Sequence, residues 1–196
     1  AFPMNLEKFC QYTYQFSFIP IYIYDRHQLL SKASSYPSLQ LPEMILTQIL
    51  EKKEPVSVFE TVSGTYYGSI RVGDGELSLL LGPVSPVPYT EDTLASFFYS
   101  YRIPPAEQET YKKQLSSIPC YTLLAFISLL LQITYAVRGE ESYSEKDFLN
   151  PSPLYGIPRE TELIREKKQR QETGYYNTIH DARRMTDPLI RNGDLE

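Results

Sequence analysis

The residue types that most often perform nucleophilic or acid–base catalysis are few and far apart in this sequence. Its 196 residues include two cysteines, Cys10 and Cys120, and two histidines, His27 and His180. Nucleophilic catalysis requires a Ser, Cys or Thr held against a base. A helix-to-strand junction separates Cys10 from His27, and Cys120 begins an apolar helix, where a thiol is inert. We therefore predict that the chain has no catalytic residues and is not an enzyme.

A polar triplet and a single carboxylate have simpler interpretations than catalysis. Asp25, Arg26 and His27 lie together between two expected strands, which is typical of a solvated turn. Glu60 lies in an expected strand, where the exposed face is its simplest location.

The cysteines, histidines and glycines give no motif for a metal or a phosphate. Four Cys and His residues are too few for a Cys- or His-rich metal site or a disulfide framework, although a single bridge stays open. The glycines flank expected strands without phosphate-loop spacing. We predict no metal and no cofactor. Two free buried thiols are typical of a reducing environment, so the sequence indicates the cytoplasm.

Composition and charge describe a globular chain without a nucleic-acid-binding surface of its own. Hydrophobic residues make up 42% and charged residues 22%, with a net charge of −5. Residues 159–196 carry eight basic and eight acidic residues, so the whole net charge lies in residues 1–158. Neither part has the basic excess that DNA or RNA binding requires.

Residues 118–137 form an uncharged, apolar segment that needs an explanation. About 20 apolar residues can span a bilayer, so a membrane helix is one interpretation. However, Ser128, Gln132 and Tyr135 form a thin polar stripe, and such a helix is more typical of a core or a dimer interface. Detergent dependence would reveal the membrane alternative. We predict no membrane span, and dimer contacts through Leu123, Ile127, Leu130 and Leu131.

Hydrophobic periodicity predicts an α+β fold. Helices are expected at residues 5–18, 43–53, 92–101, 105–116 and 118–138, and strands at 21–24, 29–32, 56–62, 65–72 and 76–81. Breakers at Asn150, Pro151 and Gly156 predict a loop linker at residues 139–158, followed by a charged helical linker at 159–196. The first 138 residues would form one domain.

This order of elements resembles the PAS/GAF-like sensor domains, which fold an antiparallel five-stranded sheet packed by helices. The segment from Ile19 to Asp25, the segment from Tyr67 to Ile70 and the Ile118-Pro119 pair before the long helix resemble the N-terminal domain of some Firmicute AraC-type transcriptional regulators. Residues 177–196 resemble the segment before the helix-turn-helix region of that family. The resemblance implies a sensor and linker whose DNA-binding module lies outside this sequence.

The resemblance also implies a pocket between sheet and helices for an unidentified small-molecule effector. Tyrosine suits such a pocket because it combines an apolar body with a hydrogen-bonding tip, and the chain has 17. Our candidates are the large side chains on expected strands, of which alternation turns roughly half away: Tyr22, Tyr24, Phe59, Tyr66, Tyr67 and Leu79.

The predicted function is the signal-sensing and dimerisation part of a transcriptional regulator, a cytoplasmic homodimer that reaches DNA only through a separate C-terminal domain. The alternative is a ligand-free dimerisation or partner-docking module. A well-defined pocket favours the first interpretation, whereas a sheet filled by its own side chains favours the second.

Overall fold

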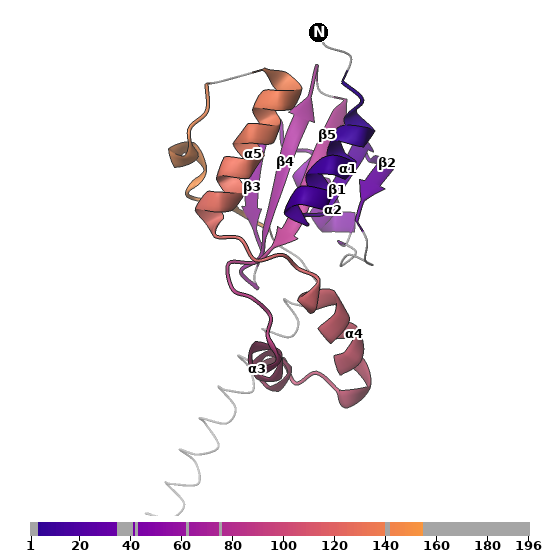
Figure 1. Cartoon of the computed structure of the whole chain (residues 1–196), viewed down its shortest axis with the longest axis vertical. Coiled ribbons are helices and arrows are strands. Elements are labelled where there is room, and N and C mark those ends of the chain that lie inside the picture. The colour runs from indigo at the N-terminus through magenta and orange to yellow at the C-terminus, as the bar shows by residue number, and fades with distance from the viewer. Residues whose placement is uncertain are drawn as a thin grey trace, which may run out of the picture. The chain divides into compact units, whose positions relative to one another are not determined.

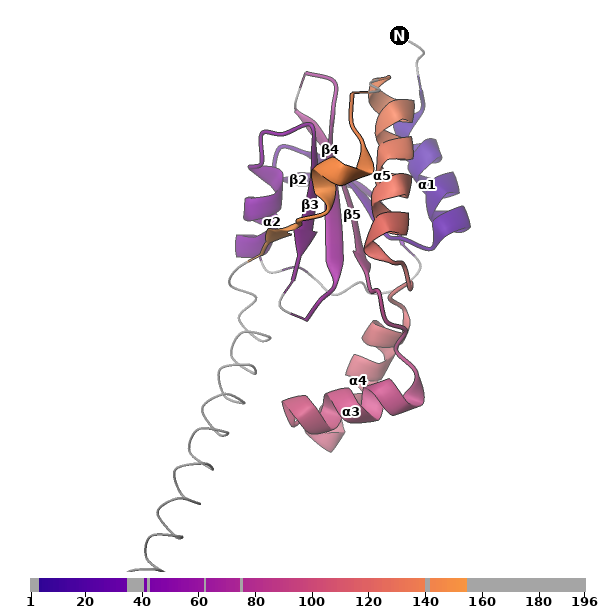
Figure 2. The same cartoon turned by 90° about the vertical axis from the view of Figure 1, so that its left-hand side faces the viewer.

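The computed structural model describes residues 4–34, 41, 43–61, 63–74, 76–139 and 142–154. Residues 1–158 form one compact unit. Its described part is a six-stranded sheet with helices on both faces (Figures 1 and 2). The predicted α+β class is thereby confirmed. The predicted helical linker at residues 159–196 lies outside the described residues.

The sheet has the strand order β2-β1-β5-β4-β3-β6. All neighbouring pairs among the first five strands are antiparallel, and β6 pairs with β3 in parallel. The sixth strand lies within the predicted loop linker, as does a short 3-10 helix, η1 (Glu145–Phe148). The strand bounds are β1 Ile21–Asp25, β2 Gln28–Ala33, β3 Val56–Glu60, β4 Tyr66–Val72, β5 Leu77–Val84 and β6 Ser152–Pro153.

Helices α1 (Leu6–Ser17) and α5 (Leu123–Arg138) cover one face of the sheet (Figure 1). Each begins with a capping side chain: Asn5 accepts a hydrogen bond from the Lys8 N–H, and Thr122 accepts one from the Ala125 N–H. We call this side the α1–α5 face. Its core is a continuous set of apolar side chains from both helices and from alternate strand positions, including Cys10, Ile23, Val58, Ile70, Leu81, Phe126, Ile127 and Leu130.

Helix α5 lies in close contact with the sheet at Gly68 of β4. A Cβ atom at this position would lie 2.7 Å from Leu130 Cδ1 and 3.2 Å from Phe126 Cζ. The absence of a side chain at Gly68 therefore allows α5 to pack directly on the strand.

Helix α2 (Glu43–Leu50) covers the opposite side, which we call the α2 face (Figure 2). Its buried residues Ile45, Ile49 and Leu50 pack with apolar residues of the sheet. Arg71 of β4 secures the end of this helix, because its guanidinium donates to the backbone carbonyls of Lys52 and Leu50 at 2.7 and 3.1 Å.

Helices α3 (Glu91–Tyr101) and α4 (Pro105–Ser116) are inserted between β5 and α5. They have a small core of their own around Leu94, Leu115 and Ile118. The chain returns at Ser85, whose N–H donates to the Pro119 carbonyl and whose carbonyl accepts from the Tyr121 N–H. Residues 118–122, predicted to be helical, are therefore used to close this insertion.

The apolar helix α5 has 16 residues. Among the described residues, no helix combines the length and hydrophobicity needed to cross a membrane. The interpretation of this segment as a core helix is confirmed for Phe126, Ile127, Leu130 and Ile133, all of which are buried.

Candidate functional site

The six predicted ligand-binding residues divide between the two faces of the sheet. Tyr22, Tyr24, Phe59 and Tyr67 belong to the apolar cluster of the α2 face. Tyr66 and Leu79 belong to the cluster of the α1–α5 face. The α2 face therefore gathers four of the six, and Phe59 and Tyr67 lie directly opposite each other on β3 and β4.

The predicted dimerisation residues occupy different environments on α5. Ile127 and Leu130 are fully buried against the sheet of their own chain, so they are core residues that no second chain can contact in this fold. Leu123 and Leu131 are half-buried and pack at the margin of the same core. An almost wholly apolar helix does not reveal from sequence which side faces inward.

Three buried serines on the α2 face were not among the predicted residues. Ser57, Ser69 and Ser78 are 7%, 5% and 6% exposed. They alternate with Val58, Ile70 and Leu79, which point into the opposite core, so all three serines lie on the α2 side. Among the described residues, none of these three hydroxyls is a fully buried atom that lacks a hydrogen-bond partner.

Strand register places the serines beside the tyrosines. One row of paired residues crosses strands β3, β4, β5 and β1, and consists of Ser57, Ser69, Leu80 and Tyr22. The neighbouring row runs from Arg71 through Ser78 to Tyr24. Directly opposed residues have Cβ atoms about 4.5–5.5 Å apart. Serines and tyrosines thus occupy neighbouring positions on four strands of the α2 face, with Leu80 between Ser69 and Tyr22.

The environment of this surface favours the neutral form of the Tyr24 phenol. Burial, and secondly the neighbouring Tyr22, raises the pKa of Tyr24. A neutral phenol both donates and accepts hydrogen bonds, as does each serine hydroxyl. The surface therefore suits a small molecule with several hydrogen-bonding groups and some apolar area.

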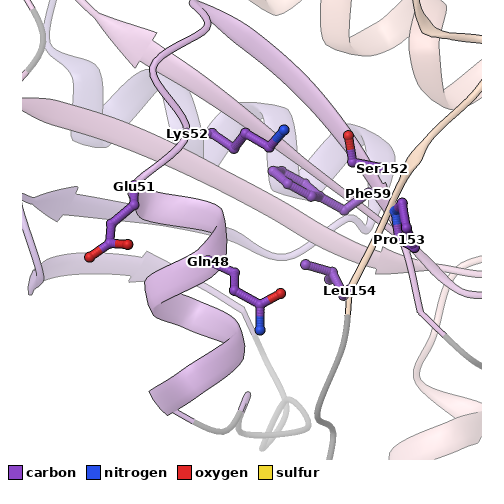
Figure 3. Close-up of a pocket in the computed structure, with 7 residues that line it drawn as sticks. All are labelled: Gln48, Glu51, Lys52, Phe59, Ser152, Pro153 and Leu154. Atoms are coloured by element: carbon purple, nitrogen blue, oxygen red, sulfur yellow. The ribbon is translucent and has the colours of Figure 1, made fainter.

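An open groove of about 490 Å³ lies at the edge of the α2 face. Gln48, Glu51 and Lys52 of α2 and the turn after it form one wall, and residues 152–154 form the other (Figure 3). Phe59 of β3 lies between them. The groove gives the edge of the face access to solvent.

The residues considered for catalysis lie apart from one another. Cys10 is buried in the α1–α5 core, where desolvation raises the pKa of its thiol to about 12. His27 is exposed in the turn between β1 and β2, and Cys120 Sγ lies 3.6 Å from the Pro86 carbonyl. Half-buried Glu60 ends β3, and after burial its charge is the second cause that raises the pKa of Tyr66.

Acidic, histidine and cysteine side chains also fail to converge. In the described part of the chain, no group of three or more of them is placed to hold a metal ion.

Comparison of the chain with protein-family models, curated proteins and solved structures found no match.

Proposed function

We propose that this chain is the N-terminal regulatory part of a transcriptional regulator, which senses a small molecule on its α2 face and controls a separate helix-turn-helix domain. The observation that carries the sensing part of the proposal is the set of serine and tyrosine side chains on neighbouring strands of the α2 face, with an open groove at its edge. Each hydroxyl can donate and accept hydrogen bonds. A ligand with several polar groups can therefore be recognised by Ser57, Ser69 and Ser78 together.

The short cover over this surface supports a sensing role. Only eight residues of α2 form a helix there, compared with 12 in α1 and 16 in α5 on the opposite face. Less packing area has to be disrupted for α2 to shift than for α5. A ligand changes a conformational equilibrium only if it binds one arrangement better than another.

The path of the chain out of the sheet supports a link from ligand to output. The Leu154 N–H donates to the Glu60 carbonyl at 2.9 Å, and the Leu154 side chain is buried in the α2-face cluster with Ile45 and Phe59. In the sequence, four residues separate Leu154 from the predicted helical linker at 159–196. A ligand that displaces Leu154 would therefore act close to the start of that linker.

Native mass spectrometry and thermal unfolding of the full chain, with pools of small polar metabolites, test the proposal. We expect a saturable ligand that raises Tm in the wild type. The stabilisation should be lost in Ser57→Val and Ser69→Val and kept in Ser96→Val, which changes an exposed serine on α3.

The location of the site and its link to output have separate tests. A ligand whose stabilisation survives both buried-serine substitutions binds elsewhere and contradicts the proposed site. Hydrogen exchange at the Leu154 amide then tests the output, because regulation through β6 requires the ligand to change the protection of that amide.

A further inference from the structure

The outward surfaces of α1 and α5 are unusual because they carry almost no charge. Residues 9–24 and residues 114–137 contain no Asp, Glu, Lys or Arg, in a chain that is 22% charged. Lys8 and Glu7 lie in the first turn of α1 and Arg138 ends α5. Both helices lie on the same side of the sheet (Figures 1 and 2), so their uncharged surfaces belong to one side of the molecule.

Large apolar side chains project from these surfaces into solvent. Phe16 of α1 is 82% exposed, and Tyr12 of α1 and Leu124 and Tyr135 of α5 are each more than half exposed. Gln11, Tyr14 and Gln15 line a depression against Ala33 and Ser34 at the β2 side. Phe16 does not line this depression. Helical spacing turns it away from Gln11, Tyr14 and Gln15, toward the side of α1 that is nearer to α5.

Phe18 adds an independent observation at the end of α1. It adopts the left-handed conformation, with φ of 60°, and its N–H donates to the Tyr14 carbonyl. Glycine is the usual residue at such a helix end, and a bulky side chain there is strained. Phe18 is also 67% exposed, so packing within the chain does not compensate for this strain. The ring of Phe18 therefore stands in solvent, two residues after Phe16 in the chain, where another molecule can contact it.

We propose that the exposed α1–α5 surface, centred on Phe16, Phe18, Ser128 and Tyr135, is the interface with a second copy of this chain. Two copies each carry a net charge of −5, so contact through a surface without charged side chains is the arrangement that places no like charges directly against each other. Depletion of charge together with enrichment of Tyr and Phe is the composition of an interface core. A two-fold axis places the same surface on both sides, which an uncharged surface tolerates without like-charge contacts.

This inference rests on the α1–α5 surface alone and is independent of ligand binding on the opposite face. It also changes the dimer contacts predicted from sequence. The second copy would meet the outward side of α5, because Ile127 and Leu130 are buried in the core.

Sedimentation equilibrium of the full chain tests the proposal, with Phe16→Glu and Tyr99→Glu as a matched pair. Both residues are exposed aromatics on helices, at 82% and 88%, but Tyr99 lies on α3 outside the surface. We expect a wild-type dimer, a dissociation constant at least about 100-fold larger in Phe16→Glu because two like charges enter the interface, and little change in Tyr99→Glu.

Three outcomes would overturn the proposal. One is a wild-type chain that remains monomeric at every concentration. Another is an equal loss of dimer in both variants, which places the contact elsewhere or makes it nonspecific. The third is a monomer that binds neutral phosphatidylcholine vesicles through Phe16, which makes the surface a membrane contact. Circular dichroism of each variant confirms that the comparison is between folded chains.

Discussion

The two faces of the sheet are built from different kinds of side chain. The α1–α5 face is filled by aliphatic and aromatic residues from two helices, and it is close-packed enough that Gly68 has no room for a Cβ atom. The α2 face combines a smaller apolar cluster with three buried serines and is covered by one short helix. The α1–α5 face is therefore a mainly apolar core, whereas the α2 face, where we propose that a ligand binds, mixes packing with hydroxyl groups.

The largest expected difference between the faces concerns the two phenylalanines that are fully buried. Phe126→Ala on the α1–α5 face should lower the free energy of unfolding by about 3–5 kcal/mol, since the surrounding core cannot collapse around the cavity. Phe59 borders the open groove, so Phe59→Ala should cost less. Urea denaturation measures both. An equal or greater loss for Phe59→Ala would remove the basis of the comparison.

A smaller effect is expected for Gly68→Ala on β4. The new methyl group would lie 2.7 Å from Leu130 Cδ1, so we expect a loss of about 1–3 kcal/mol from overpacking. The double variant Gly68→Ala/Leu130→Ala should lose less than the sum of the two single variants, because truncating Leu130 makes room for the methyl group. Strictly additive losses in urea denaturation would contradict the tight packing at this point.

Alkaline titration tests burial on the α1–α5 face through Cys10. Burial raises the pKa of this thiol from 9.0 to about 12, so between these values the unfolded chain loses a proton that the folded chain keeps. Stability is therefore full below pH 9 and falls as the pH rises toward 12. Buried Tyr24, whose pKa is also raised, acts in the same direction above pH 10.

The measurement is the free energy of unfolding as a function of pH. Cys10→Ala should flatten the decline that begins near pH 9, whereas Cys120→Ala, at an exposed position, should leave its slope unchanged. A slope that is the same with and without Cys10 would mean that the thiol is accessible in the folded chain.

The smallest effect is expected for the substitution Ser69→Ala. Ser69 follows Gly68 in β4, and its side chain points to the α2 face. The substitution removes a single oxygen atom, so it should change stability by less than about 0.5 kcal/mol without ligand. A loss above about 1 kcal/mol would show that the hydroxyl is satisfied in the free protein, and the α2 face would then resemble an ordinary core.

Element order was predictable because alternation and helical spacing are local properties of the sequence. Strand β3 shows this in the alternation of Val56 and Val58 with Ser57. The register was not predictable, so Tyr66 and Leu79 could not be separated from Tyr22 and Tyr24. Two-residue β6 has no periodicity to detect. Strand β5 continues through Gly82 and Pro83, where the pattern predicted its end.

The serines of the α2 face were missed for a related reason. A serine that alternates with apolar residues, as Ser57, Ser69 and Ser78 do, is usually interpreted as a solvent-facing position. In the folded chain these positions are nevertheless buried, which their own sequence pattern does not indicate. A run of apolar and small polar residues without charge, as in residues 56–59, 66–70 and 77–84, is the sequence signal that could have identified them.

Strand β6 pairs with β3 but comes much later in the sequence, so during synthesis β3 waits for its partner. The edge of β3 that receives residues 152–154 is made long before those residues leave the ribosome. Until then, backbone groups of Phe59 and Glu60 stand at an open sheet edge, which is a template for pairing with other chains. A translation product halted before Ser152 would contain every element of the α1–α5 face and still be prone to aggregate along β3.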